Sequence, residues 1–252
     1  MIESNIQKII RKEILTITNK TKSPHIASNL SIVDILVVIY KYFVKKNNKN
    51  KFILSKGHAC LSLYCVLHFF NYFSKKTLYT FSKNKSKLMS HASHKVPGVI
   101  FSTGSLGHGL PFAAGKAYVN KKDKIYCLIS DGEINEGSNW EALMFIGHHK
   151  LNNIKIILDY NKIQSLDFVK NVIDLEPLKK KLNSFGFYVS KIDGHNHKLL
   201  KSVIGKKTNK PHFVIADTIK GKGVSFMENQ PKWHANWPSP EYEKKALDEL
   251  SK

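Results

Sequence analysis

Arginine is almost missing from this chain of 252 residues: of its 40 lysine and arginine residues, only Arg11 is an arginine. Proteins that read nucleic-acid bases or clamp phosphates usually rely on the bidentate fork of arginine, and the lysines here are scattered along the sequence. We therefore do not interpret the formal net charge of +21 as a nucleic-acid signal. A lysine- and asparagine-rich bias, as in AT-rich genomes, is the simplest explanation, and an acidic partner chain is the alternative.

Cysteine is also scarce, since the chain has only Cys60, Cys65 and Cys127 and no CxxC pair. An odd number of such cysteines argues against a disulfide framework and against a zinc site. No apolar run reaches the length that spans a bilayer. Residues 1–15 alternate charged and apolar side chains and lack the apolar centre of a signal peptide. We expect reduced, mostly buried thiols in a cytoplasmic chain that does not insert into a membrane.

Apolar runs of strand length alternate with segments of helical period along the whole chain. This alternation predicts an α/β fold with a mainly parallel sheet sandwiched by helices, in a single domain over residues 1–252 without repeats or linkers. Residues 74–105 have no strong period and are expected to be mainly loop. The predicted strands are 52–54, 125–130, 154–160, 187–192 and 212–217. The predicted helices are 3–20, 31–46, one ending near Phe70, 107–120, 136–150, 175–186, 196–205 and one from about Pro240. In the helix 31–46 we expect Ser31 as N-cap and Asp34 as its N3 partner, and we expect Gly186 to close the helix 175–186.

Two polar residues follow neighbouring predicted strands at the points where these strands end. Asp131 comes after the strand 125–130, and Asn161 comes after the strand 154–160. Ligands of open α/β sheets bind in the crevice outside the carboxyl ends of the strands. Mg²⁺ prefers oxygen ligands, which Asp131, Asn161 and the backbone carbonyl of Ile163 can supply, with phosphate oxygens and water completing its octahedral shell. Because Gly132 also lets the backbone approach an anion, the pattern predicts a site for Mg²⁺ and a diphosphate; an Asp-Gly pair after a strand can otherwise be a simple turn.

The same segment resembles the thiamine-diphosphate motif of transketolases, in the stretches SDGEINEG, NWEA, HHKL and DYNKIQ. Ser130 replaces the first glycine of the usual GDG, but the acidic residue of the motif is retained. The resemblance implies a thiamine-diphosphate-binding fold, its diphosphate-binding domain, with thiamine diphosphate and Mg²⁺ as cofactors. It also implies that the cofactor contacts Gly104, Ser105 and Leu106 of the loop STGSLG, and Asp131, Gly132, Glu133 and Asn161.

Four histidines fall at positions that match the family. The resemblance implies that His58, in SKGHAC, approaches the cofactor diphosphate and the substrate oxygen, and that His234 lies near the diphosphate. His91 matches the histidine that contacts substrate hydroxyls, and His25 matches the one near the reactive carbon. Imidazole suits such work because it donates or accepts a proton near neutral pH. We expect the other histidines to be ordinary surface or core residues.

The resemblance covers essentially all of this chain but only the N-terminal part of a full-length transketolase. In the family, the glutamate that activates the cofactor belongs to a separate pyrimidine-binding domain, and Glu136 matches a glutamate that reaches across the interface toward it. The resemblance therefore implies the N-terminal subunit of a two-chain enzyme, which assembles as α2β2 and is active only with a C-terminal transketolase subunit. The implied reaction transfers a two-carbon ketol unit from a ketose or ketose phosphate to an aldose, with His25, His58, His91 and Glu136 as catalytic residues.

Departures from the family pattern leave alternatives open for the substrate. Asp167 stands where the family usually has glycine, and Ala235 follows His234 where glycine is common. These changes motivate the alternative of a related subunit that uses a 2-oxo acid or an unusual sugar donor in specialised carbohydrate biosynthesis. The remaining alternatives are a basic nucleic-acid-binding protein and a catalytically inactive regulatory subunit.

Overall fold

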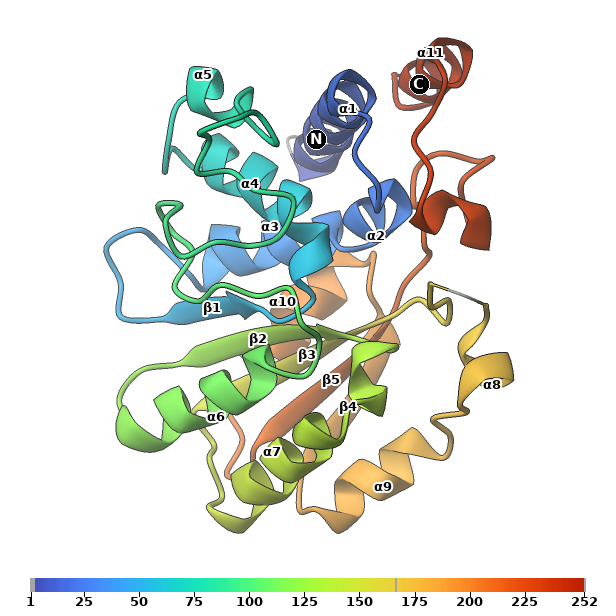
Figure 1. The fold of residues 1–252 in the computed structure, drawn as a ribbon. Helices are drawn as coiled ribbons and strands as arrows, with labels where there is room; N and C mark the ends of the chain where they lie inside the picture. The colour runs from blue at the N-terminus through green and yellow to red at the C-terminus, as the bar shows by residue number, and fades with distance from the viewer. Residues whose placement is uncertain (1–2, 166, 252) are drawn as a thin grey trace.

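The computed structural model describes residues 3–165 and 167–251, and its centre is one five-stranded sheet (Figure 1). Every neighbouring pair of strands in the described chain is parallel, which confirms the predicted fold class. The strands lie in the order β1-β2-β3-β5-β4. Their bounds are β1 Lys51–Leu54, β2 Ile125–Ser130, β3 Ile154–Tyr160, β4 Tyr188–Asp193 and β5 His212–Asp217.

The strand register brings the ends of the central strands to one edge of the sheet. Ser130 pairs with Asp159, and Tyr160 pairs with Asp217, so the loops after β2, β3 and β5 leave the sheet side by side. All residues of β2 and β3 are buried, as expected for parallel strands that are covered on both faces. The polar groups that follow these strands are therefore attached to rigid backbone that is shielded from water.

Helices cover both faces of the sheet and form two separate apolar clusters (Figure 1). The first face carries α1 (Glu3–Thr21), α2 (Ile26–Ser31), α3 (Val33–Tyr42), α4 (Cys60–Phe69), α10 (His197–Gly205) and α11 (Pro240–Glu249). The second face carries α6 (Gly109–Val119), α7 (Gly137–His148) and α9 (Leu178–Ser184). The short helices are α5 (Lys75–Leu78) and α8 (Val169–Val172), and the 3₁₀ turns are η1 (Gly57–Ala59), η2 (Glu133–Asn135) and η3 (Pro231–His234).

One predicted helix, 31–46, is wrong in its extent and its cap. The chain forms α2 and α3 with a break at Ile32, which has φ −98° and ψ 0°. Ser31 is the last residue of α2, and its hydroxyl donates to the carboxylate of Asp159 at 2.8 Å instead of capping a helix. Asp34 pairs with Arg11 at 2.6 Å. Both side chains are drawn into buried polar networks with distant segments, which a local sequence pattern does not reveal.

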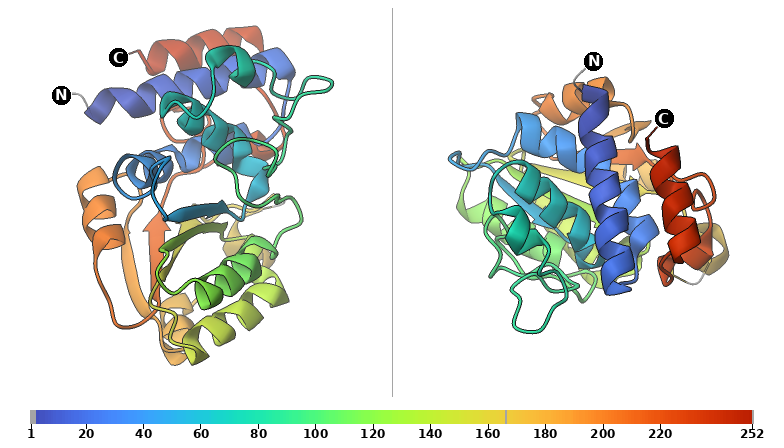
Figure 2. Two further views of the ribbon diagram at one scale, coloured as in Figure 1. Left: turned by 90° about the vertical axis from the view of Figure 1, so that its left-hand side faces the viewer. Right: turned by 90° about the horizontal axis from the view of Figure 1, so that it is seen from above.

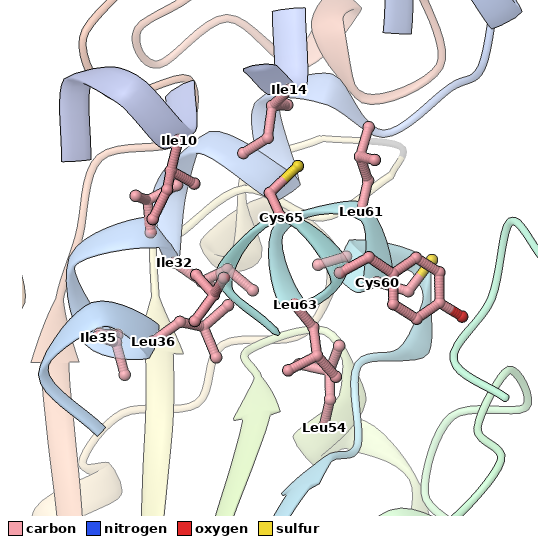
Figure 3. Packing of buried hydrophobic residues seen from close by; sticks show 14 of the residues in the cluster. Ile10, Ile14, Ile32, Ile35, Leu36, Leu54, Cys60, Leu61, Leu63 and Cys65 are labelled. Carbon is pink, nitrogen blue, oxygen red and sulfur yellow. The ribbon is translucent and has the colours of Figure 1, made fainter. Parts of the chain in front are cut away.

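The packing around α4 shows how two of the three cysteines are buried in the apolar core. Figure 3 shows Cys65 of α4 beside Ile14 of α1, while Leu63 points toward Leu54 of β1. All three cysteines are free and buried, and burial raises the pKa of the Cys65 thiol well above its usual range. Their burial confirms the sequence prediction of mostly buried thiols, and they pack here as small apolar side chains.

The ends of the described chain lie on the same side of the molecule. Figure 2 shows α11 running beside α1, and the two helices are in contact. Within residues 3–165 and 167–251, none of the helices combines the length and the apolar character that a bilayer crossing requires.

Candidate functional site

A cavity of about 420 Å³ opens at the carboxyl ends of β2 and β3, and we call it the strand-tip cavity. It brings together most of the residues that the sequence singled out, from loops that are far apart along the chain. Its described lining is His25, Ser28, Lys56, His58, His91, Gly104, Leu106, Ser130, Asp131, Gly132, Asn135, Glu136, Asn161, Ile163, Gln164, Ser165, Lys220 and His234.

Asp131 is a buried carboxylate whose hydrogen bonds come from backbone groups. One carboxylate oxygen accepts from the N–H of Gly132 at 2.8 Å, and the other accepts from the N–H of Lys162 at 2.6 Å. Burial, together with the nearby carboxylate of Asp159, raises the pKa of Asp131 from 3.8 to about 6. A divalent cation bound here would compensate this charge directly.

The amide of Asn161 is oriented by its neighbours. Its nitrogen donates to the carboxylate of Asp159 at 3.0 Å, and its oxygen accepts from the N–H of Ile163 at 3.1 Å. The carbonyl of Ile163 accepts from the ammonium of Lys220 at 2.9 Å and keeps a second lone pair. The donors of Asp131, Asn161 and Ile163 are a carboxylate, a carboxamide and a carbonyl oxygen, and this hard-oxygen set fits Mg²⁺.

A metal here would depend on more than acidic and imidazole side chains. Among residues 3–165 and 167–251, no group of three or more histidine, cysteine or acidic side chains is arranged to hold an ion. A Mg²⁺ ion in the strand-tip cavity would therefore need the amide, the carbonyl and oxygens of a bound diphosphate. This requirement agrees with known Mg²⁺ sites, in which one or two carboxylates bind the ion together with phosphate oxygens.

Sequence reasoning missed a buried polar network beneath these donors. Asp159, near the end of β3, is fully buried and pairs with Lys56 at 2.5 Å. The hydroxyls of Ser31 and Thr218 donate to the same carboxylate at 2.8 and 2.5 Å. Burial alone would raise the pKa of Asp159, but the charge and hydrogen bond of Lys56, together with the hydroxyls of Thr218 and Ser31, lower it below its usual value. The signal in the sequence was an acidic residue inside the apolar run IKIILDY.

Lys220 was missed as well, although it lies at the centre of the cavity wall. Its ammonium donates to the carbonyl of Ile163 at 2.9 Å and contacts the ring of His234 at 2.9 Å. Burial and the charge of Lys56 lower its pKa to about 8. The signal was the motif KGKG after the last strand: Gly221 has φ +81°, and a Cβ there would lie 2.4 Å from the carbonyl oxygen of Met227. The turn that requires this glycine directs Lys220 inward.

The four predicted histidines form one cluster. The ring of His25 lies 5.3 Å from that of His58, 6.1 Å from that of His91 and 5.1 Å from that of His234, measured between centroids. Burial, then the charge of nearby groups, lowers the pKa of His25 to about 4 and that of His234 to about 3. The pKa of His58 is likewise held well below its usual range by burial. The rings of His25, His58 and His234 are therefore neutral at neutral pH, and each has one donor and one acceptor nitrogen.

His25 also has an unusual backbone. Its φ is +73°, in the left-handed region that non-glycine residues rarely adopt. The conformation is held by backbone hydrogen bonds: the N–H of His25 donates to the carbonyl of His234 at 2.8 Å, and its carbonyl accepts from Asn29 at 3.0 Å. Strained backbone of this kind tends to occur at functional sites. Here it ties the start of α2 to η3 and fixes two of the four rings relative to each other.

Two residues expected to contact the cofactor do not line the cavity. Ser105 is exposed, while its neighbours Gly104 and Leu106 are in the lining. Glu133 is fully buried, and its carboxylate accepts from the hydroxyl of Ser55 at 2.5 Å and from the N–H of Gly107 at 3.0 Å. These contacts hold the end of the loop 104–107 in place, and the expected contact of Glu133 with the cofactor stays a prediction. Glu136 does line the cavity, immediately before α7.

Taken together, the strand-tip donors, two inward lysines and a cluster of four imidazoles define a class of protein. It is a parallel α/β domain with a cavity at the carboxyl ends of its strands, and the cationic side chains of Lys56 and Lys220 line that cavity.

Comparison with known proteins identifies the family. Residues 2–241 match the family described as transketolase, thiamine diphosphate binding domain. The chain is 38% identical to an apulose-4-phosphate transketolase subunit of Actinobacillus succinogenes, over 99% of this chain and 95% of that protein. It is 35% identical to a 6-deoxy-6-sulfo-D-fructose transketolase subunit of a Clostridium species, over 97% and 94%.

A solved structure agrees with these relatives. The transketolase of Campylobacter jejuni superposes with a TM-score of 0.89 at 30% identity; the match covers 98% of this chain but 42% of that one. The chain belongs to the transketolase family and corresponds to its thiamine diphosphate binding domain.

Proposed function

We propose that this chain is the N-terminal subunit of a two-chain, thiamine-diphosphate-dependent transketolase. It would transfer a two-carbon ketol unit from a ketose or ketose phosphate to an aldose, together with a C-terminal subunit that supplies the pyrimidine domain. The observation that carries the proposal is the placement of Asp131 and Asn161 at adjacent strand tips in one cavity. Relatives named as transketolase subunits support it, because the chain matches one of them at 38% identity over 95% of that relative and another at 35% identity over 94%.

The cavity residues fit the proposed cofactors. Asp131, Asn161 and the carbonyl of Ile163 would hold Mg²⁺, and the N–H groups and side chains around them would hold the diphosphate. When bound, thiamine diphosphate supplies the carbon nucleophile that makes the carbon–carbon bond of the ketose breakable. Lys220 and His234, in contact at 2.9 Å, would face the diphosphate and offset its charge.

The remaining cavity side chains would handle protons on the sugar. His25, His58 and His91 lie within one cluster, and a neutral imidazole can give a proton to a carbonyl oxygen or take one from a hydroxyl. Because burial keeps His25 and His58 uncharged, they would not repel a cationic ring bound nearby. Glu136 at the cavity edge would meet the partner subunit.

An uncovered apolar surface next to the cavity supports the partner. Between α6 and α7 lies a groove of about 410 Å³, which we call the apolar groove, lined in part by Pro111, Ala114, Ala142 and Phe145. Phe145 is 38% exposed and Met144 is 50% exposed. Exposed apolar patches of this kind mark interaction sites. We propose that the C-terminal subunit covers the groove in an α2β2 assembly, and that the complex works in the cytoplasm, where free thiols such as Cys65 stay reduced.

A second candidate is a transketolase-type subunit with an unusual sugar or a 2-oxo acid as donor. The loop after β3 carries the departure Asp167, whose carbonyl accepts from the N–H of Gln164 at 2.9 Å. Gln164 and Ser165 line the strand-tip cavity, so this loop shapes the entrance that a donor would use. The two named relatives bear the names of unusual sugars, and this agrees with the second candidate.

The test is calorimetric titration of the chain, together with its C-terminal subunit, with thiamine diphosphate and Mg²⁺. We expect Asp131→Ala to abolish Mg²⁺-dependent binding and ketol transfer, while the control Asp248→Ala on α11 retains both. Unchanged binding by Asp131→Ala would overturn the cofactor assignment. Complete ketol transfer by the isolated chain would overturn the two-chain proposal.

A further inference from the structure

A second cavity lies at the opposite end of the sheet, where the strands begin. Its volume is about 290 Å³, and it is formed by the segments that precede or open β2, β3 and β5. With a rise of about 3.3 Å per residue, the six residues of β2 separate it from the strand-tip cavity by roughly 20 Å. We call it the lysine cavity, because six of its ten described lining residues are Lys121, Lys122, Lys124, Lys155, Lys206 and Lys207.

The lysine cavity is far more basic than the chain as a whole. Basic residues make up 40 of 252 residues in the sequence, against six of ten around this cavity, and the other four are asparagine and threonine. Within the described residues, none of these six lysines forms a salt bridge with an acidic side chain. Lysines that repel one another across a cavity without counter-ions attract anions.

Lys155 distinguishes this cavity from a patch of surface lysines, because its side chain is buried and held in place. It is 7% exposed at the start of β3, and its ammonium donates to the carbonyl of Lys206 at 2.5 Å and contacts His212 at 3.0 Å. Burial, then the neighbouring Lys155 charge, lowers the pKa of His212 to about 3, so this ring is a neutral acceptor. The second ring nitrogen of His212 bonds the hydroxyl of Ser190 at 2.9 Å. Burial, then the charge of Lys124, lowers the pKa of Lys155 to about 8, so its ammonium is still charged at neutral pH, and its partners, the Lys206 carbonyl and the His212 ring, are neutral.

The lining also restricts the chemistry of the ligand. Among the described lining residues there is no aromatic ring to stack on a base and no apolar side chain to hold an acyl chain. The volume lies at the small end for ligand sites. We propose that the lysine cavity binds a small, non-aromatic polyphosphate, with inorganic triphosphate as the simplest representative, independently of the site for thiamine diphosphate.

The test is calorimetric titration of the protein, alone and with its partner subunit, with inorganic triphosphate at physiological salt. We expect the double variant Lys122→Gln/Lys207→Gln to weaken binding at least tenfold. Neither side chain is buried, so the fold is retained. The matched control Lys244→Gln/Lys245→Gln removes the same charge from positions on α11 that are not buried either, and we expect less than a twofold change.

Three results would overturn the proposal. Equal weakening by both double variants would mean that only net charge matters. Competition by thiamine diphosphate with Mg²⁺ would place the triphosphate in the strand-tip cavity. Tighter binding of a single-stranded RNA than of triphosphate, lost in Lys122→Gln/Lys207→Gln, would mean that the cavity belongs to a nucleic-acid surface.

Discussion

Replacing Asp131 by asparagine tests the electrostatics of the strand-tip cavity. In the chain without cofactor, this carboxylate is 2% exposed and lies near the carboxylate of Asp159. A buried acid near another acid lowers the stability of the folded chain whenever it is ionised. We therefore expect Asp131→Asn to stabilise the isolated chain while it removes Mg²⁺-dependent cofactor binding.

The magnitude follows from the pKa. A rise of the pKa of Asp131 from 3.8 to about 6 corresponds to about 3 kcal/mol of stability lost on ionisation. Asparagine has one acceptor oxygen in place of two, so one of the bonds from Gly132 or Lys162 is lost, at about 1.5 kcal/mol. The net expectation is a gain of about 1.5 kcal/mol in the free energy of unfolding at pH 7.5.

The pH dependence gives the sign of this effect independently. Because the pKa of Asp131 is higher in the folded chain than in the unfolded chain, the wild type loses stability as pH rises from about 4 to about 6. The electrostatic part of the gain in Asp131→Asn, about 3 kcal/mol, is therefore complete above pH 6 and disappears below pH 4, where only the loss of the hydrogen bond remains. Urea unfolding at a series of pH values, with the slope checked for constancy, measures it.

Asp34→Asn is the matched control with the opposite sign. Burial alone would raise the pKa of Asp34, but hydrogen bonds from His195 and His197 and the charge of Arg11 lower it. Removing this acid leaves Arg11, which is 6% exposed, without its counter-ion, at a cost of about 3–5 kcal/mol. If Asp131→Asn destabilises the chain at pH 7.5 as Asp34→Asn does, the electrostatic account of the cavity is incorrect.

Three further predictions concern packing and protonation. Gly147→Ala should lower the free energy of unfolding by about 2 kcal/mol, because the new Cβ would lie 2.0 Å from the carbonyl oxygen of Phe185. Gly115→Ala, where a Cβ would meet nothing within 4 Å, should raise the free energy of unfolding by about 0.5–1 kcal/mol. Urea unfolding of the two variants compares these effects. Leu36→Ala, at a fully buried site, should cost about 2–5 kcal/mol by the same measurement, and a cost under about 1 kcal/mol would contradict the packing. An NMR titration should show His234 protonating near pH 3, not near 6.5.

The sheet could be predicted because its signal is local. Five short apolar runs gave five strands within a residue or two of their observed bounds, since buried parallel strands need continuous apolar side chains. The helix 31–46 was predicted wrongly because Ser31 and Asp34 are held by Asp159 and Arg11, more than twenty residues away in sequence. Such long-range polar contacts leave no periodic trace in the sequence.

The candidate site could be predicted in part for the same reason. Asp131 and Asn161 follow strands directly, and strand register alone brings them together. Lys56 and Lys220 were missed because their importance comes from burial beside Asp159 and His234, which depends on the tertiary fold. The roles assigned to single site residues stay predictions until the binding experiments are done.

The apolar groove between α6 and α7 has a consequence for how a cell must produce this chain. If the proposed partner subunit covers this groove, a newly made copy exposes apolar side chains until that subunit binds, and a formal charge of +21 makes free copies repel one another in the meantime. This repulsion acts over only about 8 Å at physiological ionic strength. Balanced synthesis of the two polypeptides would shorten the time that the groove stays uncovered. Until the proposed partner binds, the excess of lysine would reduce aggregation of this chain.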